Sequence, residues 1–95
     1  MLKTYIISYD LIRPESRPEY TKLINTIKSA QIWAKPLESF WIIRSSLSSM
    51  QIAQEIKKVV DNNDKFLVIE VGNDWASFNL DEKVISWLRS NISKI

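Results

Sequence analysis

The 95-residue sequence contains no cysteine and no histidine, and its only glycine is Gly72. These absences exclude disulfides, zinc sites built on thiolates or imidazoles, and catalytic triads that use histidine. A single glycine also leaves little material for a glycine-rich phosphate loop. If the protein is an enzyme, carboxylates, hydroxyls or a hard metal ion must therefore support the reaction.

A strong excess of one charge is also missing. Thirteen Lys and Arg residues against eleven Asp and Glu give a formal net charge of +2, which does not by itself indicate nucleic-acid binding. No segment approaches the roughly 18 consecutive apolar residues of a membrane helix, and residues 1–4 lack the pattern of a secretion signal. With 45% hydrophobic residues, we expect one globular domain over residues 1–95 of a cytoplasmic protein without membrane contact.

Residues 4–11 have the two-residue alternation of a β-strand rich in β-branched and aromatic side chains. We interpret this stretch as the central strand, with the carboxylate of Asp10 near its carboxyl end. Because side chains at such strand ends point into the crevices where ligands bind, Asp10 is a candidate site residue. The alternative is that Asp10 only begins the following turn by accepting hydrogen bonds from the loop amides.

The rest of the sequence predicts three helices and further strands. Ser16, Ser48 and Asn79 are each followed three residues later by Glu or Gln, a spacing typical of helix N-caps. We expect the second helix to end at residues 61–63, whose asparagines tolerate a left-handed closing conformation. Residues 32–45 predict two short strands or one bent strand because Pro36 interrupts them, and residues 65–71 predict another strand.

This order of elements predicts an α+β sandwich. A ferredoxin-like fold suits it: a mainly antiparallel four-stranded sheet with two helices on one face, plus a C-terminal helix over about residues 80–93. The other sheet face would expose four residues that form too apolar a patch to stay in water, namely Leu2, Thr4, Ile6 and Ser8. Either a second copy of the chain, giving a homodimer, or the C-terminal helix would cover them.

Basic and aromatic residues supply material for binding a nucleic acid or a protein. Guanidinium and ammonium groups on loops suit phosphate contacts; the alternative is that they are only solvated surface charges. The candidates for nucleic-acid binding are Arg13, Arg17, Lys35 and Arg44. Trp75 could stack on a base or anchor a partner. Alternatively, Trp75 and Phe78 pin the last helix onto the core.

Two short motifs, Tyr9-Asp10 at the end of the first strand and Ser39-Phe40-Trp41 before the second helix, support a family resemblance. Over roughly residues 3–71 the chain resembles the CRISPR-associated Cas-two and virulence-associated protein D families, which are small ferredoxin-like dimers. It is more similar still to short SinR-like proteins, which share the Ile-Ser-Tyr-Asp-Leu start and a terminal pair like Trp87-Leu88. No helix-turn-helix pair of the kind found in repressors is expected, since a strand follows the second helix.

The resemblance implies a metal-dependent nuclease acting on RNA or DNA. In those families the first-strand Asp of each subunit holds one divalent ion at the dimer axis, so this role falls on Asp10, with Mg²⁺ or Mn²⁺ as the cofactor. Ser39 would contact a phosphate or the water bound to the metal, or else it merely begins the next strand. The chain departs from the family pattern at Leu37, where a polar residue is usual, and it lacks the usual glycine before that strand.

Two other functions fit the same predicted dimer. One is a noncatalytic adaptor or regulator that binds nucleic acid or a protein partner. The other is a plain assembly module whose open sheet face serves only to build a complex. Phosphate-based binding should weaken steeply with salt, which distinguishes nucleic-acid binding from simple assembly.

Overall fold

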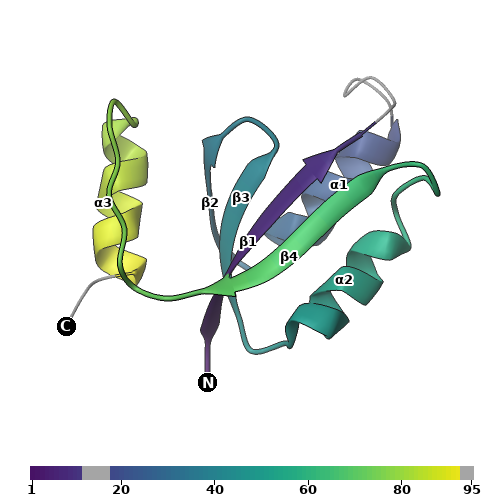
Figure 1. Cartoon of the computed structure of the whole chain (residues 1–95), viewed down its shortest axis with the longest axis horizontal. Helices are drawn as coiled ribbons and strands as arrows, with labels where there is room; N and C mark the ends of the chain where they lie inside the picture. Colours follow the sequence, from purple (N-terminus) through teal and green to yellow (C-terminus); the bar gives the residue numbers. More distant parts are fainter. Residues whose placement is uncertain (12–17, 93–95) are drawn as a thin grey trace.

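The computed structural model describes residues 1–11 and 18–92 (Figure 1). Its elements follow in the order β1 (Lys3–Asp10), α1 (Pro18–Lys28), β2 (Ile32–Leu37), β3 (Phe40–Ser45), α2 (Ser49–Lys57), β4 (Lys65–Val71) and α3 (Glu82–Asn91). The strands form a four-stranded antiparallel sheet in the order β2-β3-β1-β4. The α+β class is thus confirmed, and the arrangement is compatible with a ferredoxin-like sandwich.

Strand β1 lies in the middle of the sheet, which confirms the central strand expected from its alternation. It pairs with β3 from Lys3 to Ser8 and with β4 from Thr4 to Asp10. The predicted strand pair over residues 32–45 is the β2–β3 hairpin, whose register shifts between Ala34 and Leu37. Pro36 lies within this irregular stretch, as expected for a residue that has no N–H to donate to a neighbouring strand.

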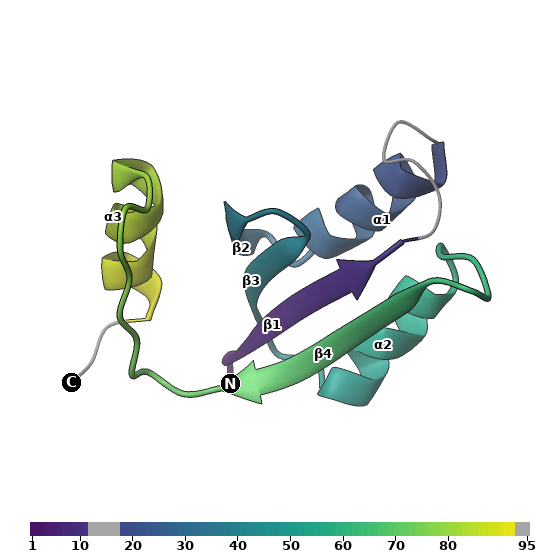
Figure 2. The ribbon, with the colours of Figure 1, turned by 45° about the horizontal axis from the view of Figure 1, so that its top comes forward.

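One face of the sheet is covered by α1 and α2, which lie together on that side (Figure 2). Alternate residues of β1 and β3 point into this layer because side chains of a strand alternate between its faces. They meet the apolar stripes of the two helices. The resulting core consists of Tyr5, Ile7, Tyr9, Leu23, Ile27, Trp41, Ile43, Ile52 and Ile56.

Helix α3 packs separately, beside the edge strand β2 (Figure 1). Leu88 and Ile92 of α3 are buried, as is Ala34 of β2, and none of the three belongs to the main core. The indole Nε1 of Trp75 donates a hydrogen bond of 2.9 Å to the Ile92 carbonyl, so Trp75 anchors the last helix. The same prediction is wrong for Phe78, which is 86% exposed.

Helix α2 begins as predicted but ends earlier. Ser48 is its N-cap, with a reciprocal capping box to Gln51. The helix ends at Lys57 and not at residues 61–63, because a separate turn forms there. The Asp61 amide donates to the Asp64 side chain at 2.8 Å, and the Asp64 amide donates to the Asp61 carbonyl at 3.0 Å.

The predicted cap of the last helix is also wrong. Asn79 adopts a positive φ of 62°, so the chain turns there before the helix begins. Asp81 is the N-cap, and its Oδ1 accepts a hydrogen bond of 2.9 Å from the Lys83 amide. Both residue types cap helices well, and the left-handed turn at Asn79 moves the start to Glu82. The predicted cap at Ser16 lies outside the described residues.

Candidate functional site

Asp10 is exposed at the end of β1, on the sheet face turned away from α1 and α2. Its neighbour Tyr9 points the other way, into the core. The antiparallel register places Lys65 of β4 directly opposite Asp10. Within the described part of the chain, neither residue takes part in an ion pair. The Asp10 carboxylate is therefore open to solvent and to a ligand.

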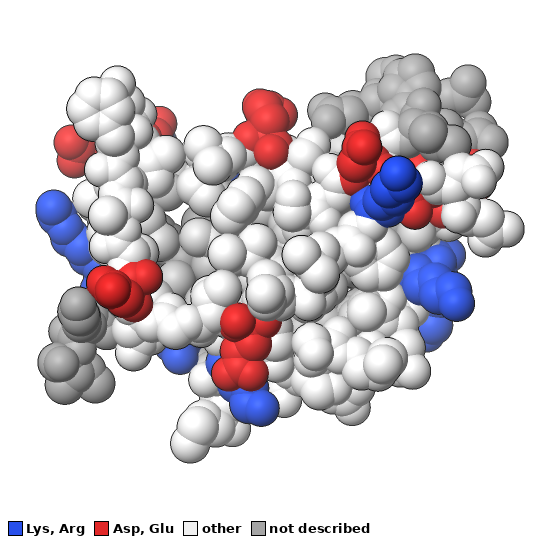
Figure 3. Space-filling model, in the orientation of Figure 1, with Lys and Arg blue, Asp and Glu red and all other residues white. Residues whose placement is uncertain are grey.

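An open hollow of about 300 Å³ surrounds this carboxylate, between the end of β1 and the beginning of β4. It is lined by Ser8, Tyr9, Asp10, Lys65, Phe66 and Leu67. Figure 3 shows acidic and basic side chains side by side over this end of the sheet. Lys65 was missed by sequence reasoning, because only the pairing of β1 with β4 reveals that it faces Asp10.

Ser39 lies at the same end of the sheet, in the turn between β2 and β3. Its carbonyl accepts a hydrogen bond of 3.2 Å from the amide of Tyr9, the residue before Asp10. Its φ of 52° is in the left-handed region, which costs energy for any residue with a Cβ. The fold thus places the turn that carries Ser39 beside the end of β1, although Ser39 does not line the hollow around Asp10.

The predicted basic residues do not all lie near this end. Lys35 is in β2 close to the hairpin turn, where its Nζ forms an ion pair of 3.2 Å with Glu38. Arg44 pairs in register with Thr4, toward the opposite end of β1, and its Nη2 donates to the Leu2 carbonyl at 3.4 Å. Arg13 and Arg17 lie outside the described residues. Lys65 is therefore the basic residue that directly faces Asp10 in the described sheet.

One chain supplies few metal ligands at this site. The described residues contain no group of three or more Asp, Glu, His or Cys side chains that could hold a metal ion. A carboxylate such as Asp10 is the kind of ligand that Mg²⁺ and Mn²⁺ prefer, but these ions usually need more than one protein ligand or a bound phosphate. The described residues of one chain therefore fit such an ion only together with a further carboxylate, such as one from a second molecule.

The sheet face that carries Asp10 remains partly apolar and exposed. Leu67 and Ile69 of β4 are 59% and 47% exposed, and Figure 3 shows a broad uncharged area on this side. The expected patch on β1 differs in detail, since Thr4 is only 5% exposed and Ile6 and Ser8 are partly covered. Because β1 is central, side chains of β3 and β4 flank it. The exposed apolar residues Leu67 and Ile69 of this face therefore lie on β4, an edge strand.

Comparison with known proteins assigns no family to this chain. In the part of the chain that the structure describes, no helix has both the length and the apolar character needed to cross a membrane. A scan against protein-family models and a search of curated proteins found no match.

Proposed function

We propose that this protein is a homodimer of ferredoxin-like fold that hydrolyses RNA or DNA with Mg²⁺ or Mn²⁺ held by Asp10 of both copies. The observation that supports it best is the location of Asp10. Its exposed carboxylate ends the central strand on the same sheet face as the exposed side chains of Leu67 and Ile69. A twofold contact that buries this face about an axis near the end of β1 would bring the Asp10 carboxylates of two copies close together.

The dimer rests on the apolar character of the open face. Burial of apolar area contributes roughly 25 cal/mol per Å², and a twofold contact uses the same surface on each copy. An axis passing close to the end of β1 places Asp10 of one copy beside Asp10 of its partner. Two carboxylates brought together repel each other unless a cation or a proton lies between them.

The roles of the site residues follow from their chemistry. Asp10 of each copy would hold the ion, which when bound supplies an activated water and neutralises charge on the phosphate. The Lys65 ammonium, opposite Asp10 in the sheet, attracts the nucleic-acid backbone toward the carboxylates. The Ser39 hydroxyl, on the adjoining turn, donates to a phosphate oxygen.

The decisive test is Asp10→Asn in purified protein, with end-labelled RNA and DNA and added Mg²⁺ or Mn²⁺. We expect Asp10→Asn to hydrolyse the substrate at least about 100-fold more slowly than the unmodified protein, because the substitution removes the charge of the metal ligand. Glu38→Gln is the matched control, since Glu38 is an exposed acid on the neighbouring turn. Equal activity in Asp10→Asn and Glu38→Gln would refute the proposal.

The dimer is tested separately by Leu67→Lys. In a monomer this exposed position tolerates lysine, whereas in the proposed dimer two ammonium groups would be buried at the interface. We expect sedimentation equilibrium to report dimers for the unmodified protein and monomers for Leu67→Lys. Met50→Lys, at an exposed apolar residue of α2, should leave the dimer intact. Dissociation by both substitutions, or by neither, would contradict this interface.

A noncatalytic adaptor is the second candidate, and one observation favours it. Among the described residues, Asp10 is the one carboxylate that lines the hollow, and they contain no group of three or more possible metal ligands. An adaptor would bind labelled RNA or DNA without cleaving it, and Asp10→Asn would leave the affinity unchanged. Its affinity should fall steeply with salt, whereas a protein-only assembly module would keep its partner at high salt.

A further inference from the structure

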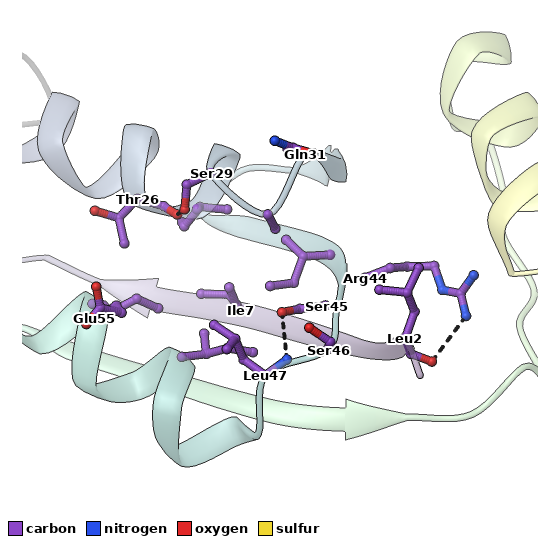
Figure 4. Close-up of a pocket in the computed structure, with 15 residues that line it drawn as sticks. Leu2, Ile7, Thr26, Ser29, Gln31, Arg44, Ser45, Ser46, Leu47 and Glu55 are labelled. Atoms are coloured by element: carbon purple, nitrogen blue, oxygen red, sulfur yellow. Dashed lines mark hydrogen bonds between the residues drawn. The ribbon is translucent and has the colours of Figure 1, made fainter.

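A second pocket, of about 300 Å³, lies on the helical side of the sheet, toward the end opposite Asp10 (Figure 4). It opens between the C-terminal end of α1 and the beginning of α2. Its apolar wall includes core isoleucines from all the surrounding elements: Ile7, Ile27, Ile43, Ile52 and Ile56. The inner wall of the pocket is therefore mainly apolar.

The pocket exists because the residues that close this end of the helical layer are small or turn away. Helix α1 ends at Lys28, and the chain turns toward β2 at Gln31, whose φ is 72°. Ala30 and Ser45 line the opening but are too short to fill it. The space between the two helices consequently stays open above the isoleucines.

Ser45 presents an unused hydrogen-bond donor in this pocket. Ser45 as a whole residue is 9% exposed, and its Oγ accepts a hydrogen bond of 3.1 Å from the Leu47 amide. Among the described residues, none accepts the proton of the Ser45 hydroxyl. A hydroxyl can accept and donate at the same time, so the Ser45 proton remains available to an acceptor atom on a molecule bound in the pocket.

Two charged side chains, Glu55 and Arg44, lie around the pocket. Glu55 forms an ion pair of 2.7 Å with Lys58. The guanidinium of Arg44 is turned away from the pocket (Figure 4). Its Nη2 donates to the Leu2 carbonyl at 3.4 Å, while its buried Nε has no hydrogen-bond partner among the described residues. A charged ligand would therefore lose hydration without meeting a free opposite charge on the pocket wall. The site favours an uncharged molecule.

We propose that this pocket binds a small, uncharged, largely apolar molecule whose single hydrogen-bond acceptor pairs with the Ser45 hydroxyl. Its volume is at the lower end of the range of ligand pockets, roughly 300–1,000 Å³. A compact molecule with an aromatic ring or a branched alkyl group and one carbonyl or ether oxygen suits this size. This site is independent of the proposed nuclease site, since it uses the other face of the sheet.

Two probes of nearly the same shape test the proposal: acetophenone, which has a carbonyl acceptor, and ethylbenzene, which has none. The protein is labelled with ¹³C on isoleucine methyl groups and titrated with each probe by NMR. We expect saturable shifts at Ile27, Ile43 and Ile52, while Ile42 and Ile69 on the opposite sheet face serve as internal controls. Acetophenone should bind about fivefold more tightly, the effect of one hydrogen bond.

Variants separate the hydrogen bond from the cavity. Ser45→Ala should make the two probes bind equally, whereas Ser46→Ala, at an exposed neighbour, should preserve the preference for acetophenone. Ala30→Leu should block both probes by filling the opening, without altering Ser45. The proposal is overturned if the pocket methyl groups do not shift, if Ile69 shifts equally, or if the preference survives in Ser45→Ala.

Discussion

Both faces of the sheet carry apolar side chains, but these side chains have different surroundings. On the face under α1 and α2, Ile7 is completely buried, and the neighbouring strand contributes Ile43 at 2% exposure. On the other face, Ile69 and Leu67 are about half exposed, and α3 contacts the edge strand β2. Helices α1 and α2 bury the apolar side chains of one face, whereas the other face keeps apolar side chains exposed.

The largest expected effect comes from comparing isoleucines on the two faces. Ile7→Ala should lower the free energy of unfolding by about 3–4 kcal/mol, because it removes buried methyl groups and leaves a cavity. Ile69→Ala should cost less than about 1 kcal/mol in the monomer, since the side chain is half exposed. Urea denaturation followed by circular dichroism measures both values.

Protein concentration makes the same pair of variants informative about the dimer. In a dimer that buries Ile69, the loss in Ile69→Ala should grow with protein concentration, because association stabilises the folded state. The loss in Ile7→Ala should come mainly from the monomer core. If Ile69→Ala were as costly as Ile7→Ala at every concentration, the two faces would not differ in the way described.

A smaller effect is expected from adjacent residues of β1 that point to opposite faces. The Tyr9 hydroxyl accepts a hydrogen bond of 3.1 Å from the buried indole of Trp41 and lies 3.2 Å from the Tyr20 hydroxyl. Tyr9→Phe leaves the Trp41 Nε1 without this acceptor and should cost about 1–2 kcal/mol. Ser8→Ala, on the open face, should change the free energy of unfolding by less than about 0.5 kcal/mol. Thermal and urea unfolding of both variants test this contrast, and equal losses would contradict it.

The sequence was most informative where local chemistry determines structure. The alternation of Tyr5, Ile7 and Tyr9 predicted both the central strand and its buried face, because strand side chains alternate. The Ser48 capping box predicted the start of α2, since its hydrogen bonds join residues only three positions apart. Asp10 could be placed at the end of a strand because the same local alternation runs up to it.

The missed features depend on residues that are distant in the sequence or on competing local turns. Lys65 faces Asp10 only because β1 and β4 pair in one particular register, which no local pattern encodes. Asn79 and Asp81 are both good helix caps, and the backbone turn at Asn79 decides between them. Phe78 was expected to help anchor the last helix because it is hydrophobic, yet its side chain is exposed, whereas the Trp75 indole donates a hydrogen bond to the Ile92 carbonyl.

The smallest expected effect concerns Ser39, where conformation and chemistry can be separated. Its φ of 52° favours glycine, so Ser39→Gly should raise the free energy of unfolding by about 0.5 kcal/mol: relief of left-handed strain exceeds the added entropy of the unfolded chain. Ser39→Ala keeps the strain and should be nearly neutral. Both substitutions remove the hydroxyl. If that hydroxyl positions a phosphate, both variants should therefore lose hydrolysis activity to the same extent. Full activity in the stabilised Ser39→Gly protein would show that Ser39 serves only the turn, and the open face would then act through Asp10 and Lys65 without it.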